Sequence, residues 1–146
     1  MEINIKKFNE NAIIPTYGSE LAAGCDVYAD IENSIEIKAG ETKLIGTGIG
    51  MEIPRGYVGL VYARSGLATK QGLAPANKVG VIDADYRGEI KVALHNHSNE
   101  TRIIEPKERI AQLVIAPYIT ANFKEVDEFE EDTERGTNGF GSTGIN

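Results

Sequence analysis

Short runs of alternating apolar and polar residues recur along the 146-residue chain, separated by glycine, proline and asparagine. Alternation with a period of two is typical of β-strands with one buried face, and no long segment carries apolar residues at helical spacing. The runs that predict strands are 3–5, 22–29, 35–37, 44–53, 57–62, 78–82, 89–94 and 110–115. Many short strands between turn residues indicate an all-β sandwich or barrel.

The period changes only between residues 63 and 71. This segment predicts one short helix, with Ser65 as its N-cap and Gly72 as its C-terminal stop. Backbone N–H groups at the start of a helix have no partner within the helix, so Arg64, Ser65 and Gly66 together predict an anion site. The alternative is an ordinary capped helix with an arginine on its surface.

The stretch 80–90 carries the densest candidate chemistry. Two predicted strands flank a turn that contains Asp83, Asp85, Tyr86 and an arginine, which predicts a β-hairpin. A hairpin presents its backbone N–H and C=O groups in a fixed order, so it can hold a flat ligand beside a carboxylate that acts as a base. The alternative is that aspartate and glycine only form the turn and that Tyr86 packs on the sheet.

Polar residues interrupt three of the other predicted strands. Asp26 follows a run of small residues, which either brings it close to a ligand or metal or only caps a turn. Gln112 stands in a strand apolar enough to be buried on both faces, so it is either a satisfied structural residue or a ligand contact. His95 and His97 share one strand face, but without a third ligand they make a weak zinc site.

The net charge of −7 is unevenly distributed. Residues 124–134 contain seven acids and one lysine, a net charge of −6, which leaves −1 for the rest of the chain. Nucleic acid is therefore an unlikely partner, because affinity for a phosphate backbone depends on clustered lysine and arginine. A free nucleotide needs only a few well-placed cations.

The composition changes again at residues 135–144, which contain four glycines, an arginine, hydroxyl side chains and Phe140. This favours a mobile arm that wraps phosphates while Phe140 stacks on a base, and a disordered tail is the alternative. We therefore divide the chain into a β-barrel domain at 1–122, an acidic linker at 123–134 and a glycine-rich arm at 135–146.

Cys25 is the only cysteine, so no internal disulfide can form and a reducing compartment is expected. The N-terminus lacks the apolar core of a signal peptide. The longest largely apolar run, 111–119, is interrupted by Gln112 and Pro117 and is too short to span a bilayer. We expect a soluble, cytoplasmic protein with no membrane partner.

Five of these segments occur in one order along the chain. They are Ala-Gly-Cys-Asp-Val at 23–27, Arg-Ser-Gly at 64–66, the stretch 77–88, Arg-Ile-Ala-Gln-Leu at 109–113, and the stretch 135–144. Together they closely resemble the five motifs of the trimeric dUTP pyrophosphatases, with the third and fifth motifs the most specific and Val27 where many members have leucine. The resemblance implies a jelly-roll-like β-barrel that assembles as a homotrimer, in which each site collects motifs from all three subunits.

The resemblance also implies an activity. The enzymes of this family hydrolyse dUTP to dUMP and pyrophosphate with Mg²⁺, which keeps uracil out of DNA and supplies dUMP for thymidylate synthesis. Asp83 would be the general base that holds a water in line with the α-phosphorus, and Asp26 would hold Mg²⁺ indirectly, through water. The residues that the resemblance implies for substrate binding are Arg64, Ser65, Gly66, Asn77, Val81, Ile82, Tyr86, Lys91, Gln112, Arg135, Phe140, Gly141, Ser142 and Thr143.

The resemblance assigns these residues to different parts of the nucleotide. Asn77 and the hairpin backbone near Val81, Ile82 and Lys91 would read the uracil edge, as an added strand is read. Tyr86 would lie under the deoxyribose and leave no room for a 2′-hydroxyl. The second motif and Gln112 would bind the triphosphate, and the arm would cover its terminal phosphates and exclude water.

Two other interpretations fit part of the pattern. A dCTP deaminase, or a bifunctional enzyme, has the same fold and nucleotide class, but the Arg-Ser-Gly segment and the pair Asp83 and Tyr86 favour hydrolysis. A non-catalytic nucleotide-binding β-barrel can use Asn77 and Arg64 for recognition, but it has no use for a base at Asp83.

Overall fold

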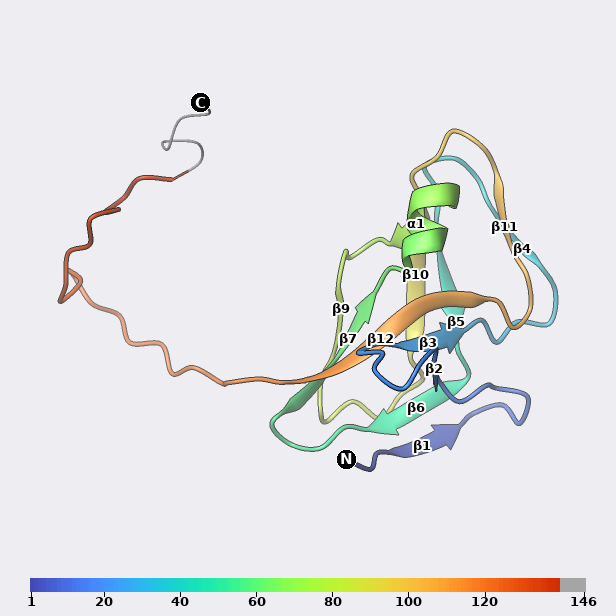
Figure 1. Cartoon of the computed structure of the whole chain (residues 1–146), viewed down its shortest axis with the longest axis horizontal. Helices are drawn as coiled ribbons and strands as arrows, with labels where there is room; N and C mark the ends of the chain where they lie inside the picture. Colours follow the sequence, from blue (N-terminus) through green and yellow to red (C-terminus); the bar gives the residue numbers. More distant parts are fainter. Residues whose placement is uncertain (140–146) are drawn as a thin grey trace.

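Twelve strands and one helix make up the part of the chain that the computed structural model describes, residues 1–139 (Figure 1). The all-β class with one short helix is confirmed. The elements are β1 (Asn4–Lys7), β2 (Thr16–Tyr17), β3 (Cys25–Tyr28), β4 (Ile35–Ile37), β5 (Thr42–Gly46), β6 (Ile49–Glu52), β7 (Tyr57–Tyr62), α1 (Ser65–Gln71), β8 (Leu73–Pro75), β9 (Gly80–Ile82), β10 (Lys91–Asn96), β11 (Arg102–Ile104) and β12 (Arg109–Pro117).

The strands pair antiparallel in four sheets, which do not close into one continuous barrel. The largest sheet has the order β2-β3-β12-β7-β9, and a second sheet has the order β5-β10-β8. Two further pairs, β1 with β6 and β4 with β11, complete the described strands. Because β12 lies between β3 and β7, Gln112 stands opposite both Asp26 and Tyr62.

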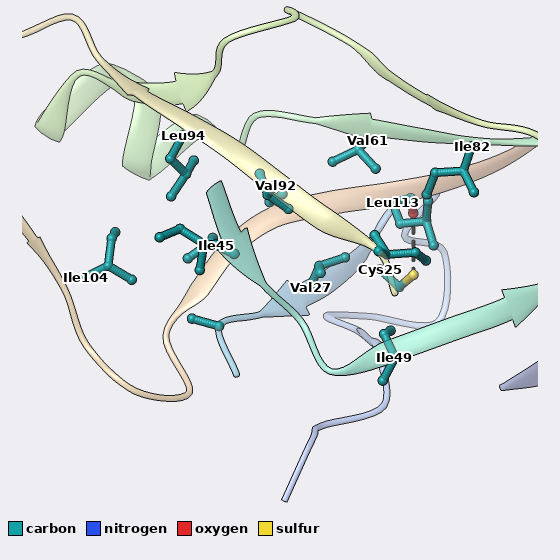
Figure 2. Close-up of a cluster of buried hydrophobic side chains, with 14 of the residues drawn as sticks. Cys25, Val27, Ile45, Ile49, Val61, Ile82, Val92, Leu94, Ile104 and Leu113 are labelled. Carbon is teal, nitrogen blue, oxygen red and sulfur yellow. Dashed lines mark hydrogen bonds between the residues drawn. The ribbon is translucent and has the colours of Figure 1, made fainter. Parts of the chain in front are cut away.

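The core lies where these sheets face one another, and Figure 2 shows side chains from β3, β5, β7, β10 and β12 meeting there. Alternation along β10 explains the packing, because Val92 and Leu94 are buried while Lys91, Ala93 and His95 are not. The same alternation buries Asn96. Its amide donates to the carbonyls of Ile37 at 2.8 Å and Glu100 at 2.7 Å, so the buried polar group is satisfied.

The strand expected over 44–53 is split in two at Thr47 and Gly48. Gly48 has φ +65°, a left-handed conformation that cannot continue a strand. The Thr47 hydroxyl is buried and donates to the Ile90 carbonyl at 2.6 Å. As a result, β5 joins the sheet of β10 while β6 pairs with β1.

Helix α1 ends where the sequence predicts and begins one residue earlier than expected. Gly72 has φ 70°, and its N–H bonds to the carbonyls of the last turn, so the predicted stop is confirmed. The N-cap is Arg64 rather than Ser65, and no side chain caps this end. Ser65 is instead the first helical residue, and the buried Leu67 anchors the helix on the core.

Residues 118–139 contain no helix or strand, and Figure 1 shows them running away from the sheets as an extended trace. The acidic residues 125–134 are all exposed, as expected for a segment of like charges. The domain boundary at residue 122 stays a prediction. Within residues 1–139, no helix is long and apolar enough to cross a membrane.

Cys25 offers a direct test of the core. Burial raises the pKa of its thiol, and Sγ lies 3.4 Å from the Leu113 carbonyl (Figure 2). Because the thiolate is the reactive form, we expect iodoacetamide at pH 8 to alkylate the native protein at least about 100-fold more slowly than the urea-unfolded chain. Equal rates, measured by mass spectrometry, would show that Cys25 is accessible in the native fold.

Candidate functional site

The strands on either side of the turn at residues 83–90 lie in different sheets. β9 pairs with β7, and β10 pairs with β5 and β8, so the predicted pairing of these two strands as a hairpin is wrong. The physical reason is an alternative partner for the returning chain. The N–H of Ile90 donates to the carbonyl of Ile49 at 2.8 Å, which draws the second arm toward β6.

A cavity of about 400 Å³ lies between the separated strands. Its volume is within the range of small-molecule sites in proteins. In the described part of the chain no strand pairs with β9 on the side away from β7, so the backbone of residues 80–82 can bond a ligand there. The lining residues are Leu44, Val61, Pro75, Asn77, Gly80, Val81, Ile82, Asp83, Tyr86, Glu89, Ile90, Lys91, Val92 and Ala93.

The structure therefore brings together six of the predicted site residues around one cavity. They are Asn77, Val81, Ile82, Asp83, Tyr86 and Lys91. Val81 is 62% exposed beside the buried Ile82, so an apolar side chain is open to a ligand at the cavity wall. A Cβ at Gly80 would lie 3.1 Å from the Val61 Cβ, so the glycine allows β9 to pack closely against β7 beside the Asn77 amide.

The turn holds Asp83 and Tyr86 on the same cavity. The Tyr86 N–H donates to the Asp83 carbonyl at 3.1 Å, and the Tyr86 hydroxyl donates to the Glu89 carbonyl at 2.8 Å. A Cβ at Gly88 would lie 2.5 Å from that hydroxyl oxygen, so only glycine lets the ring lie against the turn. Asp85 does not line this cavity and faces a second hollow, with Arg55 and Tyr118.

A second group of predicted residues surrounds Asp26 on β3. Its Oδ1 accepts a hydrogen bond from Arg64 Nε at 2.7 Å, and its Oδ2 accepts one from Arg109 Nη1 at 3.1 Å. The Asp26 side chain is 16% exposed, so both ion pairs are partly shielded from water. Arg109 was not among the predicted site residues. Arg109 lies at the start of β12, beside a shift in the strand register, and the pattern of apolar residues does not predict its contact with Asp26.

Gln112 connects this group to the start of α1. Its amide Nε2 donates to the Ala63 carbonyl at 2.7 Å, which satisfies the side-chain donor in the half-buried strand. Its Oε1 lies so close to Gly24 that a Cβ there would approach it to 2.7 Å. These contacts hold the Gln112 side chain in a fixed position beside the start of α1.

The two groups do not share a cavity within one chain. Asp26, Arg64, Ser65, Gly66 and Gln112 are all absent from the lining of the cavity between β9 and β10. Ser65 and Gly66 are exposed at the start of α1.

The predicted arm is only partly within the described chain. Arg135 lies in the exposed tail and donates from Nε to the Asn138 carbonyl at 2.9 Å. The predictions for Phe140, Gly141, Ser142 and Thr143 lie outside the described residues.

The histidine pair forms an aromatic contact. The rings of His95 and His97 meet edge to face with centroids 4.3 Å apart, and His95 Nδ1 bonds the Thr42 hydroxyl at 2.8 Å. Desolvation, with Lys78 and His95 nearby, lowers the pKa of His97. Across residues 1–139, no three His, Cys, Asp or Glu side chains are grouped to hold a metal ion.

Comparisons with known proteins cover nearly the whole chain. The family model described as dUTPase matches residues 10–144. A deoxyuridine 5′-triphosphate nucleotidohydrolase of Nautilia profundicola is 56% identical over 144 residues, which cover 99% of each chain. The protein of the same name from Francisella tularensis subsp. holarctica is 45% identical over 99% of this chain and 100% of its own.

Solved structures agree with these relatives. The dUTPase of Staphylococcus bacteriophage 80alpha, solved with dUPNHPP, superposes with a TM-score of 0.90 at 32% identity over 99% of each chain. The dUTPase of phage phi11 of S. aureus superposes with a TM-score of 0.80 at 28% identity, over 89% of this chain and 99% of its own. Sequence motifs, fold and relatives all agree, and the chain belongs to the dUTPase family.

Proposed function

We propose that the protein hydrolyses dUTP to dUMP and pyrophosphate. The observation that carries this proposal is the cavity between β9 and β10, where an open strand edge, the Asn77 amide, the Asp83 carboxylate and the Tyr86 ring meet. Family membership supports the same reaction, since its curated relatives are named for it.

Uracil binds in the cavity between β9 and β10 in this proposal. Uracil is flat and presents an acceptor, a donor and an acceptor along one edge, so it can pair with backbone groups of Val81, Ile82 and Lys91 as an added strand would. The Asn77 side chain adds a further contact. Cytosine presents a donor at its 4-position, where uracil has an acceptor, and the thymine methyl collides with the cavity wall.

Tyr86 sets the sugar specificity in this proposal. Its hydroxyl is held by the Glu89 carbonyl, and Gly88 allows the ring to lie against the turn, so the ring is a fixed surface beside the cavity. A deoxyribose packs on this surface, and a 2′-hydroxyl finds no room there.

Asp83 acts as the general base for hydrolysis. It accepts a proton from a water held in line with the α-phosphorus, and the water oxygen bonds to that phosphorus. The bond from the α-phosphorus to the oxygen that bridges it to the β-phosphate breaks, and pyrophosphate leaves. Asp83 and Glu89 are the two carboxylates of the turn that border the cavity, and the Glu89 carboxylate already contacts the Gly48 N–H and Lys91. Asp85 lines only the second hollow and supports the turn.

Arg64, Ser65, Gly66 and Gln112 bind the triphosphate in this proposal. Both oxygens of Asp26 already accept hydrogen bonds from guanidinium groups, which fits an indirect contact with Mg²⁺ through water better than direct ligation. When bound, Mg²⁺ neutralises negative charge on the triphosphate.

Separate positions of the two residue groups support a site shared between copies. The Asp26 group does not line the cavity of its own chain, so we propose that each complete site takes the two groups from different subunits. The number of subunits, three, comes from the resemblance to the trimeric dUTP pyrophosphatases. The arm, with Arg135, Phe140, Gly141, Ser142 and Thr143, closes over the bound nucleotide. In the cytoplasm, this reaction keeps uracil out of DNA and supplies dUMP for thymidylate synthesis.

The proposal is tested by pyrophosphate release from dUTP, UTP, dTTP and dCTP, with and without Mg²⁺. Release from dUTP alone, and only with Mg²⁺, is the expected result. Ammonia release from dCTP would support the deaminase interpretation and contradict the simple hydrolase.

Asp83→Asn removes the base while keeping the shape of the side chain. We expect turnover of dUTP to fall by about 10²- to 10⁴-fold, the usual contribution of a general base, with dUTP affinity little changed. Asp85→Asn is the matched control and should keep most of the turnover. Unaltered turnover in Asp83→Asn would refute the role of Asp83.

Deletion after Glu134 tests the arm. The barrel should remain folded, with an unchanged circular dichroism spectrum, because the deleted residues offer little apolar surface to the core. Pyrophosphate release from dUTP should collapse because the site stays open to water. Full activity of the truncated chain would show that the arm is dispensable.

Tyr86→Ala tests the sugar contact. Removing the ring opens space for a 2′-hydroxyl, so the variant should release pyrophosphate from UTP. Tyr17→Ala removes another exposed tyrosine, outside the cavity, and should still reject UTP. If Tyr86→Ala also rejects UTP, the sugar is selected elsewhere.

A further inference from the structure

Glu89 is a cavity residue that the sequence motifs did not single out as a site residue. Its carboxylate reaches the turn between β5 and β6, where Oε1 accepts a hydrogen bond from the Gly48 N–H at 3.0 Å. Its Oε2 lies 3.4 Å from Lys91 Nζ. The Glu89 side chain is only 28% exposed, so this end of the residue is anchored in partly buried surroundings.

Two glycines make room for this carboxylate. A Cβ at Gly46 would lie 2.6 Å from Glu89 Oε1, so any larger residue at position 46 would displace the carboxylate. Gly48 has φ +65°, and the conformation aims its N–H at the same oxygen. The turn between β5 and β6 thus provides both the space and the N–H donor for the Glu89 carboxylate.

The main chain of Glu89 performs a different task. Its carbonyl accepts the hydrogen bond from the Tyr86 hydroxyl at 2.8 Å. The next residue, Ile90, is held on both sides, with its N–H on the Ile49 carbonyl and its carbonyl on the Thr47 hydroxyl. Glu89 therefore joins the ring of Tyr86 to a rigid part of the core.

We infer that Glu89 is a positioning residue for substrate selection, which acts through Tyr86. Its carboxylate fixes the main chain at residue 89, the fixed carbonyl holds the Tyr86 hydroxyl, and the held ring discriminates deoxyribose from ribose. This inference rests on the proposed function, because it deepens the role of Tyr86 in that site.

The contacts also indicate which property of Glu89 matters. The ion pair with Lys91 is partly exposed to water, where such pairs contribute little. The bond to the Gly48 N–H satisfies a buried backbone donor, because Gly48 is buried. A glutamine at position 89 keeps an acceptor oxygen for this N–H without the charge.

Four variants of the full-length protein test the inference. Glu89→Ala removes the carboxylate that forms the anchor. Gly46→Ala displaces this carboxylate without changing residue 89. Glu89→Gln is the conservative rescue. The matched control is Glu41→Ala, because Glu41 also accepts a bond from a backbone N–H, that of Lys38 at 2.8 Å, and pairs with a lysine away from the cavity.

Two measurements are made on each variant. The first is the ratio of kcat/KM for dUTP to that for UTP. The second is hydrogen exchange of the Gly48 amide by NMR. We expect Glu89→Ala and Gly46→Ala to lower the ratio by about fivefold to tenfold, the effect of one hydrogen bond, and to speed exchange at Gly48. Glu89→Gln and Glu41→Ala should keep the ratio within about twofold of the original and leave Gly48 protected.

The outcomes separate this inference from the proposed function. An unchanged ratio in Glu89→Ala, in a protein that hydrolyses dUTP, overturns the inference and leaves the function intact. Unchanged exchange at Gly48 overturns the anchor itself. An unmodified protein that releases no pyrophosphate from dUTP refutes the proposed function and, with it, the selection role of Glu89.

Discussion

The hydrogen bond from Ile90 to Ile49 is the contact on which the candidate site depends. It ties the returning chain to β6 just before β10, and β10 then pairs with β5 and β8 rather than with β9. In a simple hairpin, the backbone groups of the two arms would satisfy one another. Because they stay apart, the fold retains an open strand edge beside a cavity, which costs backbone hydrogen bonds that a ligand can restore.

The surroundings of this contact show why the separation is stable. Thr47 is buried and donates to the Ile90 carbonyl, and Gly48 turns the chain so that β5 and β6 leave in different directions. The same short segment therefore splits a predicted strand and holds the site open. The turn at Gly48 thus contacts Glu89 and Ile90, at the end of the turn that carries Asp83 and Tyr86.

Much of the fold could be predicted from local patterns, because strands such as β4 show clear alternation and Gly72 marks the end of α1. The motifs likewise identified Asp83, Tyr86 and Asn77, which the structure brings around one cavity. The split at Gly48, the separation of β9 from β10 and the pairing of Arg109 with Asp26 depend on contacts between distant residues. Periodicity reports the burial of each residue, and it does not report which strand becomes its neighbour.

The acidic segment at 124–134 has an electrostatic consequence for an anionic substrate. It carries a charge of −6 and directly precedes the arm, while a nucleoside triphosphate is itself strongly negative. Mutual repulsion opposes the approach of one to the other, and counterions weaken it over a distance of about 10 Å at 0.1 M salt. In the proposed closure of the arm over a nucleotide, higher ionic strength would therefore weaken this repulsion, and a swap of these acids for neutral residues would remove the sensitivity to salt.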